Sequence, residues 1–234
     1  MKKQLGIVIP VYNEENSIKK IILEWSGVLD KEFCDLIIIN DGSQDNTVNI
    51  LKNESENIDN LIIVNKKNNG HGSAIVTGYE YCVQNNYDFI FQTDSDDQFF
   101  ADDFQKIWDC RNQNLDLILG DRAHRSDSFL RVFLSRVILK KLIKILFNKN
   151  MVDPNIPFRL VKNSFLKKYL NLDPQKYIAP NIQMSLYAEN IKFIEVSHKS
   201  REFGKKNWSL KEIIKFGIRL IKDLIRFKNE KNQH

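Results

Sequence analysis

Short apolar runs alternate with amphipathic segments through the first half of the chain. Residues 5–12 (LGIVIPVY) form a continuous, largely β-branched run, which is typical of a parallel strand buried on both faces. Similar runs predict strands at residues 36–40, 61–65, 89–93 and 115–119. Between them, apolar residues recur at helical spacing and predict helices at residues 17–29, from about 45, at 73–85 and at about 102–112. This order favours an α/β fold with a mostly parallel, twisted sheet flanked by helices.

Two basic amphipathic helices frame the second half, at residues 128–147 and 209–228. Between them the pattern predicts strands at residues 158–161 and 192–196, and helices from 164 and at 180–189. The chain shows no internal repeat and no low-complexity linker, so we expect residues 1–234 to form one domain. The change in pattern near residue 123 indicates a change of role within that domain.

Composition excludes several classes of protein. The 234 residues are 42% hydrophobic and 28% charged, which excludes a disordered chain and a multi-span membrane protein. The formal net charge of +5 is modest. Three cysteines, Cys34, Cys82 and Cys110, lack the spacing of a disulfide framework or a zinc site. They predict reduced structural thiols in a cytoplasmic protein.

No segment is predicted to direct secretion or to span a membrane. The first apolar run stops at Pro10 and polar residues follow, so we expect no signal peptide. The most apolar later segment, residues 129–147, is interrupted by five cations, whereas a spanning helix needs roughly 18 uncharged apolar residues. This helix can therefore lie on a membrane, but we do not expect it to cross one.

Polar clusters follow each of the first four predicted strands. They comprise Asn13-Glu14, Asp41, residues 68–72 and residues 94–98. In an open α/β sheet, ligands bind at the carboxyl ends of the strands, near a switch in strand order. Because chance polar loops would fall equally at both edges, this placement predicts an enzyme with its site at that edge.

The familiar glycine-rich nucleotide motifs are absent. The first strand is not followed by G-x-G-x-x-G, and G-x-x-x-x-G-K-[ST] occurs nowhere. A bound diphosphate would need another means of neutralisation, and Asp94, Asp96 and Asp97 could supply it by holding Mg²⁺ or Mn²⁺. In strand geometry Asp94 and Asp96 project to one side. The alternative is that these aspartates only form a solvated turn and a helix cap before Phe99.

These motifs, in this order, resemble glycosyltransferase family 2, and its dolichyl-phosphate mannose synthase-like branch most of all. They are IPVYNEENSI (residues 9–18), INDGSQDNT (39–47), NNGHGSAIVTGYE (68–80), QTDSDDQ (92–98), Gly120-Asp121-Arg122, Arg131 with Ser135, and DPNIPFR (153–159). The resemblance implies the GT-A nucleotide-diphospho-sugar transferase fold, with a Rossmann-like sheet. Within it, residues 1–122 would bind the nucleotide sugar, residues 123–208 would face the acceptor, and residues 209–234 would form the basic amphipathic C-terminal helix.

The resemblance also implies a pocket for a nucleoside-diphosphate sugar, either UDP- or GDP-linked. Its expected residues are Pro10, Tyr12, Glu14, Asp41, Gly70, Gly72 and Asp94. Asp41 would lie near the base or ribose, unless the preceding position, Asn40, makes that contact; the family commonly has two consecutive acids here. The two glycines would let the backbone turn tightly. Pro10 and Tyr12 have a structural alternative, which is to shape the end of the strand.

The implied reaction is one in-line displacement at the anomeric carbon, with inversion and departure of a nucleoside diphosphate. Asp96 would be the principal ligand of Mg²⁺ or Mn²⁺, and Gln98 either a second ligand or only a helix cap. Asp94 would lie near the donor ribose or sugar. The metal would stabilise charge on the leaving group as a Lewis acid. The expected catalytic residues are Asp94, Asp96 and Arg122.

A lipid phosphate is the expected acceptor. A sugar hydroxyl needs a general base, and family members acting on hydroxyls usually offer a Glu-Asp pair, a dipeptide that this chain lacks. A phosphate is already ionised and needs cations instead. The expected phosphate-binding residues are Arg122, Arg131, Ser135 and Arg201, with a surface salt bridge as the alternative for each arginine. Asp153 and Arg159 are expected to tie the second half to the sheet.

These expectations describe a metal-dependent inverting glycosyltransferase that moves a sugar to a polyprenyl phosphate at the cytoplasmic membrane face. Its basic helices would bind an anionic membrane surface peripherally. Alternatively, they would pack on the sheet or on a second subunit of a homo-oligomer. A saccharide-hydroxyl acceptor in surface-polysaccharide assembly and a non-catalytic nucleotide-binding module are the alternative functions. We expect no nucleic-acid partner.

Overall fold

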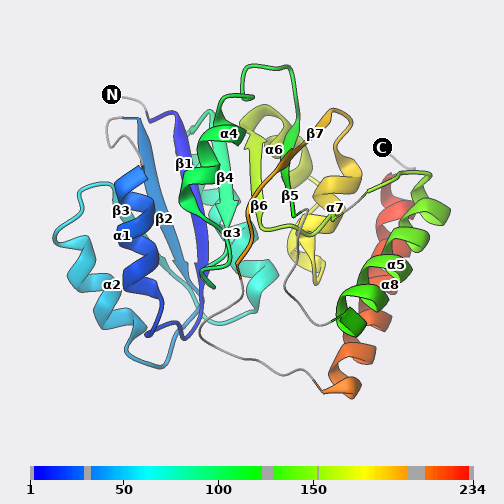
Figure 1. Cartoon of the computed structure of the whole chain (residues 1–234), viewed down its shortest axis with the longest axis horizontal. Helices are drawn as coiled ribbons and strands as arrows, with labels where there is room; N and C mark the ends of the chain where they lie inside the picture. Colours follow the sequence, from blue (N-terminus) through cyan, green and yellow to red (C-terminus); the bar gives the residue numbers. More distant parts are fainter. Residues whose placement is uncertain (1–2, 29–32, 123–128, 152, 200–208, 232–234) are drawn as a thin grey trace.

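A computed structural model describes residues 3–28, 33–122, 129–151, 153–199 and 209–231. Within these ranges, the side chains of residues 28, 129–137 and 210 are not described. Figure 1 shows a twisted sheet across the centre of the molecule, with α1 and α2 to one side and α5 and α8 next to each other at the opposite edge.

The sheet has seven strands in the order β3-β2-β1-β4-β6-β5-β7. Their bounds are β1 Leu5–Val11, β2 Cys34–Asn40, β3 Leu61–Asn65, β4 Phe89–Thr93, β5 Leu117–Asp121, β6 Phe158–Lys162 and β7 Ile191–Glu195. All pairs are parallel except those of β6, which runs antiparallel to both β4 and β5. The mostly parallel sheet expected from the sequence is therefore confirmed.

The helices follow the expected order along the chain. They are α1 Ile18–Val28, α2 Thr47–Ser55, α3 His71–Gln84, α4 Phe104–Trp108, α5 Phe129–Phe147, α6 Asn163–Leu170, α7 Pro180–Tyr187 and α8 Leu210–Lys231, with 3₁₀ turns η1 Ala101–Asp103 and η2 Pro174–Lys176. The helix expected at residues 102–112 is shorter, since its α-helical part is only α4. The strand expected at 115–119 lies two residues later, because its pairing with β6 begins at Leu117.

The two central strands are buried along their whole length, which explains their uninterrupted apolar sequence. Every residue of β1 and β2 is buried. An aromatic cluster joins α1, β4, α4 and β6 through Trp25, Phe91, Phe104 and Phe158. All three cysteines are free thiols, as expected.

Strand β1 is paired unequally on its two sides. Its pairing with β2 continues to Val11↔Asn40, whereas its pairing with β4 ends at Val8↔Gln92. The chain proceeds from β1 through β2 to β3 on one side and places β4 on the other, so the strand order switches between β1 and β4. Such a switch point is where open α/β sheets bind ligands at the carboxyl ends of their strands.

Arg159 ties the second half to the sheet, as the sequence suggested. Its guanidinium is fully buried in β6 and donates to the backbone carbonyls of Pro154, Ile156 and Asn181. The Asn181 amide donates in turn to the Gln92 side chain of β4 at 2.9 Å. These bonds connect β4, β6 and α7 below the ends of the strands.

Helix α8 packs one face against the rest of the protein and contacts α5 and α7. Leu224 and Phe227 on that face are fully buried, and Ile143 of α5 is buried beside the same core. In the part of the chain that the structure describes, no helix has the length and hydropathy to cross a bilayer.

A test of the packing between α3 and the sheet uses Gly78. A Cβ there would lie 2.3 Å from Val8 Cγ1, so Gly78→Ala should lower the free energy of unfolding by about 1–3 kcal/mol through overpacking. Gly27→Ala is the matched control, because a Cβ at Gly27 meets no atom within 4 Å and alanine favours helix by up to about 1 kcal/mol. Urea unfolding measures both, and equal stability of the two variants would contradict this packing.

Candidate functional site

The loop after β1 is fastened to the loop after β2. Asn13 adopts a positive φ of 54° and exchanges hydrogen bonds with that second loop: its N–H donates to Ser43 Oγ, and its Oδ1 accepts from the Gln44 N–H. The Glu14 N–H donates to Thr47 Oγ1 at 2.9 Å. The chain beyond β1 is thereby held over the carboxyl ends of the strands.

Pro10 and Tyr12 differ in how much of their side chains is exposed. Pro10 is buried within β1, opposite Ile39, where the pairing with β4 has already ended. Since proline has no N–H, it cannot extend that pairing. Tyr12 is 43% exposed. Of the two, Tyr12 alone presents a side chain with substantial exposed surface.

Glu14 is half-buried in the loop that leads to α1. Its Oε2 accepts a hydrogen bond of 2.8 Å from Ser17 Oγ. The Ser17 hydroxyl also lies 3.4 Å from the Ser95 carbonyl, so the loops after β1 and β4 meet here. This contact brings the first and fourth sequence motifs together, as expected for residues on either side of the switch point.

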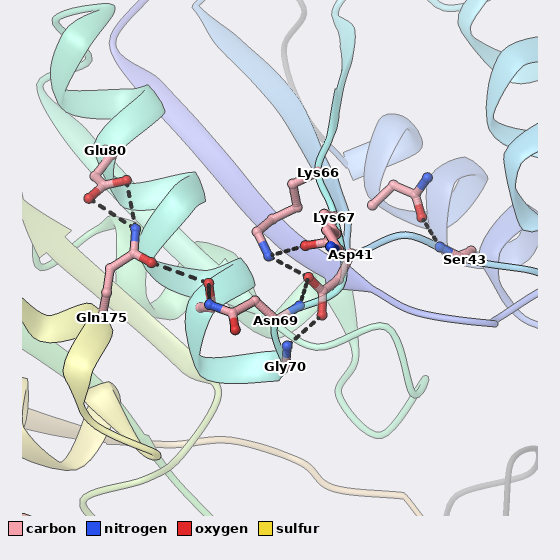
Figure 2. A network of polar contacts seen from close by, with 10 residues as sticks. Asp41, Ser43, Lys66, Lys67, Asn69, Gly70, Glu80 and Gln175 are labelled. Carbon is pink, nitrogen blue, oxygen red and sulfur yellow. Dashed lines mark hydrogen bonds and ion pairs between the residues drawn. The ribbon is translucent and has the colours of Figure 1, made fainter.

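Asp41 has both carboxylate oxygens occupied by its own chain (Figure 2). Oδ1 accepts from the Asn69 N–H at 3.1 Å and pairs with Lys66 Nζ, and Oδ2 accepts from the Gly70 N–H at 2.9 Å. The residue is 3% exposed. The structure therefore gives Asp41 a role that the sequence did not indicate, which is to hold the loop before α3 in place.

Asn40 is engaged as well. Its amide donates to Asn65 Oδ1 at 2.8 Å, and its Oδ1 accepts from the Ser43 N–H. Both residues that the sequence offered for a base contact thus shape neighbouring loops. The close approach of these loops also appears at Gly42, where φ is +72° and a Cβ would lie 2.9 Å from the Asn68 nitrogen.

The two glycines at the start of α3 are needed for different reasons. Gly70 has a φ of +91°, a conformation that L side chains rarely adopt, so the expected tight turn is present there. Gly72 instead allows close packing, because a Cβ would lie 2.8 Å from Pro180 Cδ and 3.0 Å from the Ile178 carbonyl oxygen. The first turn of α3 is thereby held against the segment before α7.

The aspartates after β4 separate into two kinds. Asp94 and Asp96 are half-buried. Asp94 Oδ1 accepts from the Gln92 amide at 3.1 Å, and Asp96 Oδ1 accepts from the Gln98 N–H at 3.3 Å. Asp97 has a φ of 57°, is 6% exposed and pairs with Lys20 and Lys199 at 2.5 and 2.6 Å. Asp97 therefore supports the loop, and Asp94 and Asp96 remain accessible.

His71 is a candidate residue that the sequence reasoning missed. Its Nε2 lies 3.4 Å from Asp94 Oδ1, and its side chain is 59% exposed. The signal was present, since His71 stands between Gly70 and Gly72 in the motif after β3. The structure brings this imidazole from α3 to the end of β4.

A divalent metal fits this site only together with a ligand. Among the described residues, no group of three or more His, Cys, Asp or Glu side chains could hold an ion by itself. Asp94 and Asp96 nevertheless present hard carboxylate oxygens at the switch point. Mg²⁺ is typically held by one or two carboxylates together with substrate phosphates and water. The donor set matches that mode of binding.

Arg122 is buried at the end of β5. Its Nε and Nη2 both donate to Asp153 Oδ2, and its Nη1 lies 3.5 Å from His198 Nε2. The guanidinium also lies 5.7 Å from the centre of the Phe99 ring. Asp153 thus binds Arg122, which the sequence analysis expected to be catalytic. Nη1 is the less engaged nitrogen of this guanidinium.

The remaining acceptor residues are not placed. The side chains of Arg131 and Ser135, in the first part of α5, lie outside the described residues, and so does Arg201. Gln98 is half-buried, and its backbone joins two loops by donating to Asp96 and accepting from the Lys199 N–H. The predicted donor-side residues therefore gather at one edge, and the acceptor side is described only at Arg122.

Comparison with known proteins identifies the class. Residues 6–172 match the family described as Glycosyl transferase family 2, so the chain belongs to this family and is a glycosyltransferase. The chain is 31% identical over 228 residues to the undecaprenyl-phosphate 4-deoxy-4-formamido-L-arabinose transferase of Yersinia enterocolitica, and 29% identical to that of Serratia proteamaculans. Each alignment covers 95% of this chain and 67% of the relative.

Solved structures confirm the GT-A fold. Glucosyl-3-phosphoglycerate synthase from Mycobacterium tuberculosis, in complex with Mn²⁺, UDP and phosphoglyceric acid, superposes with a TM-score of 0.70 at 15% identity. The alignment covers 97% of this chain and 78% of that one. TarS of S. aureus in complex with UDP-GlcNAc gives a TM-score of 0.63 at 17% identity, covering 95% and 66%.

The structural role of Asp97 can be tested by measuring the stability of the protein at different pH values. Burial raises the pKa of Asp97, but hydrogen bonds and charges from Lys199 and Lys20 outweigh it, so the pKa is lowered. A lowered folded-state pKa contributes stability above the unfolded value of about 3.9, and this is lost as the pH falls through the folded value. Asp97→Asn should therefore cost about 1.5–3 kcal/mol of unfolding free energy at pH 7 and progressively less below about pH 4.

Urea unfolding at a series of pH values measures this difference. Asp59→Asn, at an exposed position, is the control and should change little at any pH. If the free energies of unfolding of the Asp97 variant and the wild type differ by the same amount from pH 7 to pH 2, the role of these ion pairs is contradicted.

Proposed function

We propose that this glycosyltransferase moves a sugar from a nucleoside-diphosphate donor to a polyprenyl phosphate. The observation that carries the proposal is the similarity, over 95% of the chain, to transferases named for undecaprenyl phosphate. The chain spans about two thirds of the length of those relatives. The candidate site at the switch point is proposed to carry the donor half of the reaction.

The donor is proposed to bind at the switch point, over the ends of β1 and β4. Tyr12 and Glu14 lie on one side and Asp94 on the other, and Asp41 acts through the loop that leads to Gly70. This loop brings His71 to Asp94. The neighbours crystallised with UDP or UDP-GlcNAc support a uridine-linked donor.

Asp94 and Asp96 are proposed to hold Mg²⁺ or Mn²⁺ together with the diphosphate, with Gln98 as a further candidate ligand. When bound, the ion would supply a Lewis acid that stabilises charge on the leaving group. The neighbour in complex with Mn²⁺ and UDP supports this requirement. The buried pairs of Asp97 and Asp41 keep the surrounding loops rigid, so the two accessible carboxylates need not reorganise during the reaction.

The acceptor is proposed to be an ionised phosphate that attacks the anomeric carbon in line and inverts it. A phosphate oxygen is already anionic near pH 7, so it needs cations rather than a general base. Arg131, Ser135 and Arg201 are proposed to hold it, with Arg122 contributing through Nη1. The absence of a Glu-Asp dipeptide from the sequence agrees with a reaction that needs no base for a hydroxyl.

Because polyprenyl phosphates reside in membranes, we propose that the enzyme works at the cytoplasmic face of a membrane as a peripheral protein. Its basic helices would then lie close to anionic lipids.

Removal of the Asp96 carboxylate tests the metal site. Asp96→Ala should lower turnover by about 10²-fold or more, since the variant loses a proposed ligand of the ion that would stabilise charge on the leaving group. Asp102→Ala, at an exposed acid of η1, is the control and should retain activity. Transfer of radiolabelled sugar is measured with added Mn²⁺, and unfolding curves establish that both variants fold. Near-wild-type turnover of Asp96→Ala would refute the metal assignment.

The acceptor class is tested by where the radiolabel goes. A polyprenyl phosphate acceptor carries the label into an organic-extractable lipid, and Arg131→Ala should raise its KM about tenfold or more by removing a charge-assisted hydrogen bond. The donor KM should stay the same. Lys140→Ala, at an exposed cation later in α5, is the control.

If the label is found only in a water-soluble saccharide, the acceptor is a saccharide hydroxyl and not a lipid phosphate. Failure to turn over any nucleotide sugar would favour the non-catalytic binding module.

A further inference from the structure

Large apolar side chains are exposed on the outermost helices far more than elsewhere. Of the twelve such residues among those described, seven belong to α5 or α8. On α8 they are Ile213, Ile214, Ile218, Ile221 and Ile225, which are 39% to 55% exposed. Figure 1 shows α8 at the edge of the molecule, with its whole length away from the sheet.

Four of these isoleucines form a continuous line. Ile214, Ile218, Ile221 and Ile225 are spaced by four, three and four residues, so they share one side of the helix. This side differs from the one that carries the buried Leu224 and Phe227. The line of four isoleucines, which we call the isoleucine stripe, is therefore not part of the core.

Exposed cations accompany the isoleucine stripe along the helix. They are Lys211, Lys215, Arg219, Lys222 and Arg226. Their spacing puts them beside the stripe and opposite the buried side of α8. The outer face of α8 thus combines branched apolar side chains with positive charge.

The acidic residues of α8 offset only part of this charge, since Glu230 pairs with one of the five cations, Arg226. Asp223 is buried and accepts from the Ile178 N–H at 2.8 Å. Glu230 binds Tyr177, Lys176 and Arg226. Glu212 accepts from both the N–H and the hydroxyl of Ser209, which begins the helix. The outer face therefore keeps an excess of positive charge.

We propose that the isoleucine stripe and its flanking cations dock on the interface of an anionic lipid bilayer. Apolar side chains next to Lys and Arg suit such an interface, since the former enter the acyl boundary and the latter meet anionic headgroups. The inference deepens the proposed function, and its choice of a lipid partner rests on that function. It assigns the membrane contact to one face of α8 while the opposite face holds the helix to the catalytic domain.

A second copy of the chain fits this face poorly. Pairing two stripes would bring the flanking cations of both copies together, and like charges in close contact oppose association. A nucleic acid would satisfy the cations but not the isoleucines. Charge complementarity therefore favours the lipid surface over both.

The test uses the purified 234-residue chain and extruded vesicles of phosphatidylcholine with or without 30–40% phosphatidylglycerol, roughly the range that gives a strong surface potential. Wild-type protein should co-float with the anionic vesicles and not with pure phosphatidylcholine. The double variant Ile218→Ser/Ile221→Ser should bind at least about tenfold more weakly. Lys215→Ser/Lys222→Ser should weaken binding to the anionic vesicles about fivefold for each cation removed. Raised salt should weaken wild-type binding.

The matched control is Leu23→Ser/Lys52→Ser, which removes an exposed apolar side chain and an exposed cation from α1 and α2. It should bind vesicles like the wild type. Transfer to a short, water-soluble polyprenyl phosphate should be unchanged in every variant, so a failed membrane contact is distinguishable from a failed function.

Several outcomes would overturn the inference. They are absence of wild-type binding to anionic vesicles, wild-type binding by the stripe variant, and equal weakening by the control. If the stripe variant instead converts a dimer into a monomer in light scattering without lipid, the face is an interface between copies.

Discussion

The site depends on the unequal pairing of β1, which stays joined to β2 along its whole length but parts from β4 after Val8. Pro10 lies just beyond this point and cannot donate to a neighbouring strand. The chain then leaves β1 and β4 in loops on either side of the switch in strand order. The candidate donor-side residues lie at the end of β1, on these loops, on the loops after β2 and β3, or in the first turn of α3.

Burial divides the carboxylates at this edge into two kinds. Asp41 and Asp97 are buried and bound to lysines or backbone N–H groups, because a buried charge is costly unless it is paired. These partners offset the cost of burial, and the same contacts hold the loops that contain Gly70 and Lys199. Asp94 and Asp96 keep part of their surface in solvent. Carboxylates with that freedom can exchange water for a metal-bound diphosphate.

At the edge of the molecule, α8 presents two chemically different sides. Helix α8 has a side that completes the core and a side that is both apolar and positive. The same amphipathic pattern is compatible with packing alone, with membrane binding alone, or with both. Apolar residues of α8 lie on two sides of the helix. One side packs against the core through Leu224 and Phe227, and the other carries the exposed isoleucine stripe.

The sequence by itself determined the order of the elements, the mostly parallel sheet, the family and the edge that carries the candidate site, because these follow from local periodicity and from motifs contiguous in the chain. Tertiary structure decided what each polar residue does there. Asp41 and Asp97 look no different in sequence from Asp94 and Asp96, but partners 25 to 102 residues away bury the first two. Likewise, only packing against Asp153 revealed that Arg122 is mostly engaged. Such pairings join distant segments, and no local pattern records them.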